Sequence, residues 1–103
     1  MEEKSYGLSL ARIEELAGDF KALGDVGRLK IILLLLDGKK SVGAISEGVN
    51  MSQSATSHQL RILKDAKILK CEKSGNVSYY SIADEHVRTV ISTSVKHLDC
   101  EKE

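Results

Sequence analysis

The sequence predicts a single, mainly α-helical domain that carries one β-hairpin. Apolar residues recur at steps of three and four along most of the chain, which is the spacing of amphipathic helices. Two short β-like segments, Ile68–Lys73 and Val77–Ile82, lie on either side of the turn-forming sequence Ser74-Gly75-Asn76. The length of 103 residues supports one domain, and 42% hydrophobic with 29% charged residues is ordinary for a globular protein.

Two helices are expected in the first part of the chain. The first runs from about Ser9 to Leu23, and its apolar stripe consists of Leu10, Ile13, Leu16, Ala17 and Phe20. Gly24-Asp25 interrupts the pattern, and Leu29, Ile32, Leu33 and Leu36 then repeat it until Asp37-Gly38-Lys39-Lys40. Because this second helix is apolar almost all round, we expect it to lie at the centre of the domain.

Two further helices follow, separated by a tight turn. Ser41 can cap a third helix that extends to about Gly48, and Asn50 suits the turn that ends it. Ser52 can cap a fourth helix from about Gln53 to Asp65. A helical projection places apolar and polar residues of the fourth helix on opposite faces: Thr56, Leu60 and Leu63 on one, and Ser54, Ser57, His58 and Arg61 on the other.

A last helix is predicted from Asp84 to Cys100, with Asp84 as its cap and Val87, Val90, Ile91, Val95 and Leu98 as its apolar stripe. Three helices followed by a hairpin describe a winged helix-turn-helix, and we assign residues 1–103 to one such DNA-binding domain. The first and last helices each keep an apolar face that a core of this size does not cover. We therefore expect a homodimer through these two helices.

The net charge of zero hides an uneven distribution. Both ends of the chain are acidic, whereas residues 51–83 carry Arg61, Lys64, Lys67, Lys70 and Lys73 against Asp65 and Glu72. These cations alone are equally consistent with a solvated helix face. The short polar side chains beside them favour double-stranded DNA as the partner, because such side chains can approach base edges and phosphates closely. The candidate DNA-binding residues are Gln53, Ser54, Ser57, His58, Arg61, Lys64, Lys73 and Asn76.

Membrane insertion and secretion are not expected. The longest apolar run, Ile31–Leu36, is far below the roughly 20 residues that span a bilayer, and the acidic start Met1-Glu2-Glu3-Lys4-Ser5 is not a secretory signal. We expect a cytoplasmic protein. In a reducing compartment, Cys71 and Cys100 are expected to be free thiols or metal ligands, with Cys71 a small buried residue of the first strand.

Four side chains of the last helix, Asp84, His86, His97 and Cys100, are candidate zinc ligands. His86 and His97 are eleven residues apart, about 16 Å along a helix, whereas ligands of one zinc lie within about 4 Å of each other. An antiparallel pair of these helices would bring Asp84 and His86 of one subunit against His97 and Cys100 of the other, and create two equivalent sites. The alternative is that Asp84 is only a cap and the other three are ordinary surface residues.

Four parts of the chain carry a family resemblance: Ser41–Ser46, Met51–Lys64 with its Ser54, Ser57, His58 pattern, Phe20–Asp25 with Arg28, and Gly75 with Tyr80-Ser81-Ile82. In these parts the sequence resembles the ArsR/SmtB family of metal-responsive repressors, and most of all its CzrA/SmtB zinc-sensing branch. The resemblance implies a winged-helix dimer that binds operator DNA without metal and releases it when zinc binds, so that metal efflux or storage genes are expressed.

The same resemblance implies Asp84, His86, His97 and residue 100 as ligands, but the family usually has Glu or His at the last position. Cys100 departs from that pattern, and its thiolate makes cadmium or another thiophilic ion harder to exclude, with cobalt also possible. The family's other metal site needs cysteines in the third helix, which has none.

Two other functions remain open at this point. A winged-helix repressor could instead be switched by oxidation of Cys100 or Cys71. A small zinc hydrolase is disfavoured, because catalytic zinc keeps an open position and four candidate ligands would fill the shell. We therefore expect no enzymatic activity and no small organic substrate.

Overall fold

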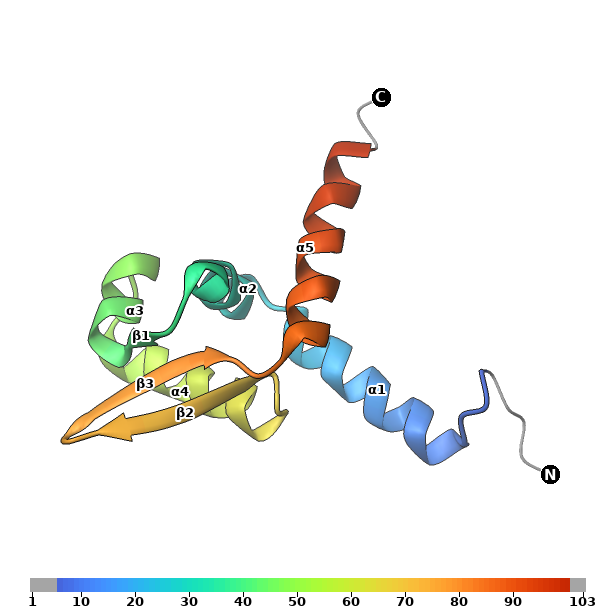
Figure 1. Cartoon of the computed structure of the whole chain (residues 1–103), viewed down its shortest axis with the longest axis horizontal. Coiled ribbons are helices and arrows are strands. Elements are labelled where there is room, and N and C mark those ends of the chain that lie inside the picture. Colours follow the sequence, from blue (N-terminus) through green and yellow to red (C-terminus); the bar gives the residue numbers. More distant parts are fainter. Residues whose placement is uncertain (1–5, 101–103) are drawn as a thin grey trace.

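The computed structural model describes residues 6–100, which form helices and a small sheet (Figure 1). In chain order the elements are α1 (Leu10–Leu23), α2 (Val26–Leu34), the 3-10 turn η1 (Leu35–Asp37), β1 (Lys40–Ser41), α3 (Val42–Val49), α4 (Gln53–Asp65), β2 (Leu69–Ser74), β3 (Val77–Ile82) and α5 (Glu85–Cys100). The predicted order of helices and hairpin is confirmed. None of the helices described within residues 6–100 is long and apolar enough to cross a membrane.

Side-chain caps set where the helices begin. Ser9, Ser41 and Ser52 each accept a hydrogen bond from the backbone N–H three residues later, at 3.3, 3.1 and 3.0 Å. Asp25 caps α2 in the same way, with 3.0 Å between its Oδ2 and the Arg28 nitrogen. Asn50 ends α3 in the left-handed conformation with φ 57°, which asparagine tolerates better than most residues.

The core lies where α2, α3 and α4 meet. Six fully buried side chains form its centre: Ile31, Ile32, Leu35, Ile45, Leu60 and Leu63. The prediction that the second helix is central is confirmed for this inner face. Its outer face is not covered in the single chain, since Val26 and Leu33 remain exposed.

The hairpin belongs to an antiparallel sheet in the order β1-β3-β2. Leu69 pairs with Ile82 and Ser74 with Val77 in the hairpin, and Gly75 makes the turn with φ 65°. The first hairpin strand begins one residue later than predicted. Strand β1 was not predicted: Lys40 and Ser41 pair with Tyr80 and Tyr79, and join the start of α3 to the wing.

The first and last helices leave the body of the domain in different directions (Figure 1). Asp84 caps α5, with 3.0 Å between its Oδ1 and the Val87 nitrogen. Arg88 anchors the base of α5, because its guanidinium donates to the carbonyl of Leu36 in η1, the turn that directly follows α2. The rest of α5 projects away from this anchor.

Candidate nucleic-acid interface and metal ligands

Helix α4 presents a polar face to solvent because its opposite face is locked into the core. Thr56, Leu60 and Leu63 are fully buried, as predicted. The six candidate DNA-binding residues of this helix are all exposed: Gln53, Ser54, Ser57, His58, Arg61 and Lys64. A face of short polar and cationic side chains on a fixed helix can enter a major groove and contact both base edges and phosphates.

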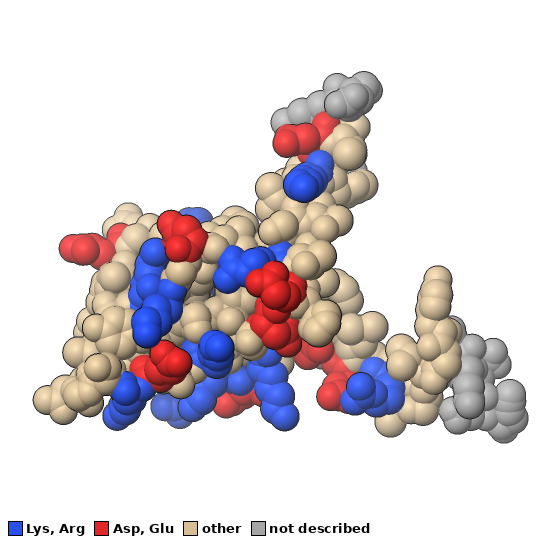
Figure 2. Space-filling view, viewed as in Figure 1, with Lys and Arg blue, Asp and Glu red and all other residues tan. Residues whose placement is uncertain are grey.

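The two candidate residues of the wing are also exposed. Lys73 lies near the end of β2 opposite Ser78, and Asn76 lies in the turn between the strands. In the space-filling view, Lys and Arg side chains are visible over the strands and along the lower edge of the domain, with some Asp and Glu among them (Figure 2). The structure therefore places a cationic wing beside the polar face of α4.

A hydrogen-bonded cluster that the sequence analysis missed holds α4 against the junction of α1 and α2. The Arg28 guanidinium donates to the Ala22 carbonyl at 2.6 Å and to Oε1 of Gln59 at 3.0 Å. The amide nitrogen of Gln59 donates to Oδ2 of Asp25 at 3.3 Å. Both ends of the Gln59 amide are thus fixed, so the rotation of α4 about its axis is set by directional bonds as well as by packing.

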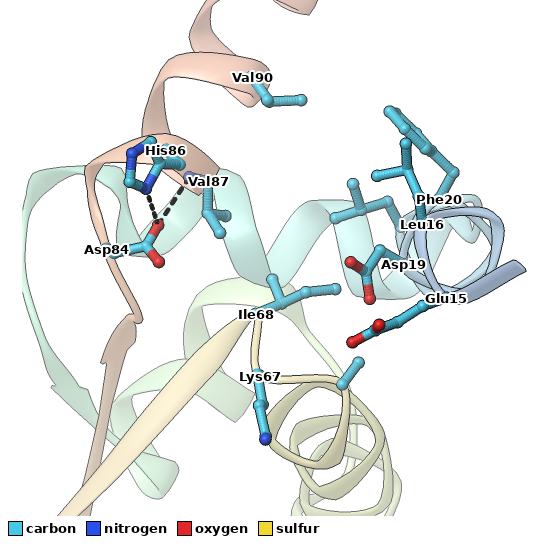
Figure 3. Close-up of a pocket in the computed structure, with 12 residues that line it drawn as sticks. Glu15, Leu16, Asp19, Phe20, Lys67, Ile68, Asp84, His86, Val87 and Val90 are labelled. Carbon is cyan, nitrogen blue, oxygen red and sulfur yellow. Dashed lines mark hydrogen bonds and ion pairs between the residues drawn. The ribbon is translucent and has the colours of Figure 1, made fainter. Parts of the chain in front are cut away.

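Asp84 and His86 lie together at the start of α5 (Figure 3). His86 Nδ1 is 3.6 Å from Asp84 Oδ1, and the imidazole is 96% exposed. The hydrogen bond from the Val87 backbone, helped by the nearby His86, holds the pKa of Asp84 below its usual value. This carboxylate is therefore ionised at neutral pH, the form that binds a metal ion.

His97 and Cys100 lie at the other end of α5, and both are exposed. The helix is continuous over 16 residues, so the structure keeps His86 and His97 about 16 Å apart along its axis. Within residues 6–100 of one chain, no group of three or more His, Cys, Asp or Glu side chains could hold a metal ion. One chain therefore carries Asp84 and His86 at one end of α5, and His97 and Cys100 at the other.

Cys71 differs from expectation. It lies opposite Tyr80 in the sheet and is half-buried rather than fully buried, because burial on its face of β2 decreases along the strand, from buried Leu69 to exposed Lys73. Both cysteines are free thiols.

An apolar pocket separates α1 from the base of α5. It has a volume of about 330 Å³, and Leu16 and Phe20 of α1 face Val87 and Val90 of α5 across it (Figure 3). Other apolar side chains on the two helices are exposed, among them Leu10 at 65% and Leu98 at 62%. These faces are the stripes that the sequence predicts for dimerisation.

Helices α3 and α4, the turn between them and the β2–β3 wing define a winged helix-turn-helix domain. A solved homodimeric winged helix-turn-helix DNA-binding domain from Mycobacterium bovis, described as a possible ArsR-family regulator, matches with a TM-score of 0.83 and 30% identity. The match covers 92% of this chain and 91% of that one.

The sequence comparisons identify the family. Residues 25–70 match the family model described as bacterial regulatory protein, arsR family. A transcriptional repressor SmtB homolog from Synechocystis is 35% identical, covering 88% of this chain and 69% of the relative. A cadmium resistance transcriptional regulatory protein CadC homolog from Staphylococcus aureus is 38% identical, covering 81% and 69%. The chain belongs to the arsR family of bacterial regulatory proteins.

Proposed function

We propose that the chain is a homodimeric transcriptional repressor that binds operator DNA without metal and releases it when zinc fills sites shared between two subunits. The observation that carries the proposal is the exposed polar and cationic face of α4 beside a cationic wing. DNA recognition requires positive charge where the phosphates run and short polar groups where the base edges lie. Neither of the α4 cations, Arg61 and Lys64, has an ion-pair partner within the described residues.

Dimerisation through α1 and α5 is supported by the apolar side chains that these helices leave exposed. Phe20 is 55% exposed and Leu98 is 62% exposed in the single chain. Both belong to the apolar stripes of their helices, which are normally buried against a partner. A second copy of the chain can cover both faces in one symmetric interface. The homodimeric state of the similar domain from Mycobacterium bovis supports the formation of a homodimer.

The candidate ligands fit zinc by their chemistry. An ionised carboxylate, two imidazoles and a thiol provide the O, N and S donors that zinc accepts in a tetrahedral shell. Asp84 and His86 of one subunit and His97 and Cys100 of the other would form each site, because the ends of one α5 are too far apart to do so. The thiolate also suits cadmium, in line with the name of the relative from Staphylococcus aureus, and cobalt remains compatible with the donor set.

The position of α5 provides a route from these sites to the DNA-binding face. With both sites filled, the two copies of α5 would be held together at both ends, and Arg88 links the base of each to η1, the turn that follows α2. The two copies of α4 then keep one fixed separation. Successive major grooves are about 34 Å apart, so a dimer held at another spacing loses affinity.

Arg61→Ala should weaken binding to duplex DNA and reduce the slope of log affinity against log salt by about one, because one phosphate contact is lost. Fluorescence anisotropy at several salt concentrations measures both quantities. Lys30→Ala is the matched control: it also removes one exposed cation, but from α2, beside a groove away from the wing. An Arg61→Ala protein with the affinity and slope of the control would remove Arg61 from the interface.

A further inference from the structure

A polar pocket of about 510 Å³ lies between α4 and the wing. Ser57, Arg61 and Lys64 line it from α4, and Ser78 and Tyr80 line it from β3. The sequence analysis assigned no role to Ser78 or Tyr80. The pocket thus combines two cations with three hydroxyl groups that come from two separate elements.

The strand geometry explains why these two residues of β3 face α4. Side chains alternate along a strand, so Ser78 and Tyr80 share one face, and Tyr79 and Ser81 share the other. Tyr79 contacts a different cation, with the Lys39 ammonium 5.6 Å from its ring centre. Ser78 and Tyr80 line the pocket, whereas Tyr79 and Ser81 do not. Substitutions of Tyr79 and Ser81 are therefore matched controls on the same strand.

Four polar side chains that line the pocket are available for a ligand. Within the described residues, the side chains of Ser57, Arg61, Lys64 and Ser78 make no hydrogen bond or ion pair. Burial, followed by the neighbouring Cys71 thiol, raises the pKa of Tyr80, and Arg61 only partly opposes this. The phenol is therefore neutral at physiological pH and can donate its proton in a hydrogen bond.

The charge of the pocket selects an anion. Asp65 is the one carboxylate among its lining residues, so the two cations leave an excess of positive charge. Hydroxyl and guanidinium donors that converge from two sides are typical of contacts to phosphate oxygens. When a helix lies in a major groove, the phosphates that border the groove run along its flanks, and this pocket lies on the flank of α4 beside the wing.

We propose that this pocket binds one phosphodiester group of the DNA backbone, with Ser78 and Tyr80 donating hydrogen bonds and Arg61 supplying the charge. The inference rests on the proposed function, since it requires DNA at α4. It locates the phosphate contact of Arg61 in this pocket, and it adds two residues of β3 to the interface.

The test measures binding of the full chain to a fluorescein-labelled duplex of mixed sequence by anisotropy. Tyr80→Phe and Ser78→Ala should each weaken binding about tenfold, because each removes a hydrogen bond to a charged group. The salt slope should stay unchanged in both, since neither variant removes a charge. Tyr79→Phe and Ser81→Ala should bind like the wild type, and thermal unfolding of all four variants checks that they are folded.

The outcomes separate the two proposals. If the wild-type chain does not bind the duplex, the proposed function itself is wrong. If it binds, and Tyr80→Phe and Ser78→Ala match their controls, the phosphate pocket is wrong while the function stands. The alternative ligand is free phosphate. A titration with inorganic phosphate at constant ionic strength, monitored through the NMR signals of the Tyr80 ring, tests it. Saturation by free phosphate without any effect of Tyr80→Phe on DNA affinity would also overturn the proposal.

Discussion

Dimers that contain one His86→Ala chain and one His97→Ala chain should bind about half as much zinc as the wild-type dimer. Each shared site takes His86 from one subunit and His97 from the other, so one site of the mixed dimer keeps all four ligands and the second loses two. Dimers of either variant alone should lose tight binding at both sites. Purification of the mixed dimer with two different tags, followed by a zinc titration against a competing chelator, measures the stoichiometry.

The third histidine offers a matched control for this experiment. His58 is exposed on α4 and lies outside the proposed sites, so His58→Ala should leave zinc binding unchanged. If the mixed dimer recovers no zinc although its formation is confirmed, the four ligands are not shared between subunits in the proposed way.

Phe20→Glu should weaken dimerisation by roughly a hundredfold or more, because it places an unpaired charge in an apolar interface. Repulsion adds to this effect, since the pocket is lined by three carboxylates, Glu15, Asp19 and Asp84, against one lysine, Lys67, and one histidine, His86. The fold of each subunit should survive, as Phe20 is 55% exposed in the single chain. Sedimentation equilibrium measures the association, and circular dichroism measures the helix content.

Val26→Glu is the control for this prediction. Val26 is 72% exposed and occupies the first position of α2, where a negative charge suits the helix N-terminus. It lies on neither α1 nor α5, so dimerisation should be unchanged. A Phe20→Glu protein that associates as tightly as Val26→Glu would show that the apolar face of α1 is not the dimer interface.

The helices could be predicted because their signals are local. The caps predicted at Ser41 and Ser52 are confirmed, and Ser9, predicted only as the start of the first helix, is also a cap. Strand β1 could not be predicted in this way, because two residues are too few to show an alternating pattern. It exists through its pairing with Tyr79 and Tyr80, which are distant in sequence.

The part of the candidate interface that lies on the single helix α4 could be predicted from the sequence. The exposed face of α4 follows from helical periodicity, and the structure confirms that its six residues are exposed. The bonds of Gln59 to Arg28 and Asp25 join residues more than thirty positions apart, which no local pattern reveals. Because side chains alternate along a strand, the sequence of β3 could have placed Ser78 and Tyr80 on the same face. It could not have shown that this face lies next to α4.

The metal ligands remain a prediction from spacing. The structure places Asp84 beside His86, and it places His97 and Cys100 at the far end of the same helix. The match to the arsR family model ends at residue 70, before any of the four ligands. The family assignment therefore supports the DNA-binding part of the function independently of the metal sites.

The most direct test of the account compares binding of one labelled operator in the presence of chelator and of saturating zinc. DNA fragments selected for binding to the metal-free protein provide the operator, and anisotropy measures the affinity at constant salt. The account predicts that zinc weakens binding, by about 5- to 150-fold for a coupling of ordinary size, and that operator DNA lowers zinc affinity by the same factor. Equal or tighter binding in saturating zinc would contradict it.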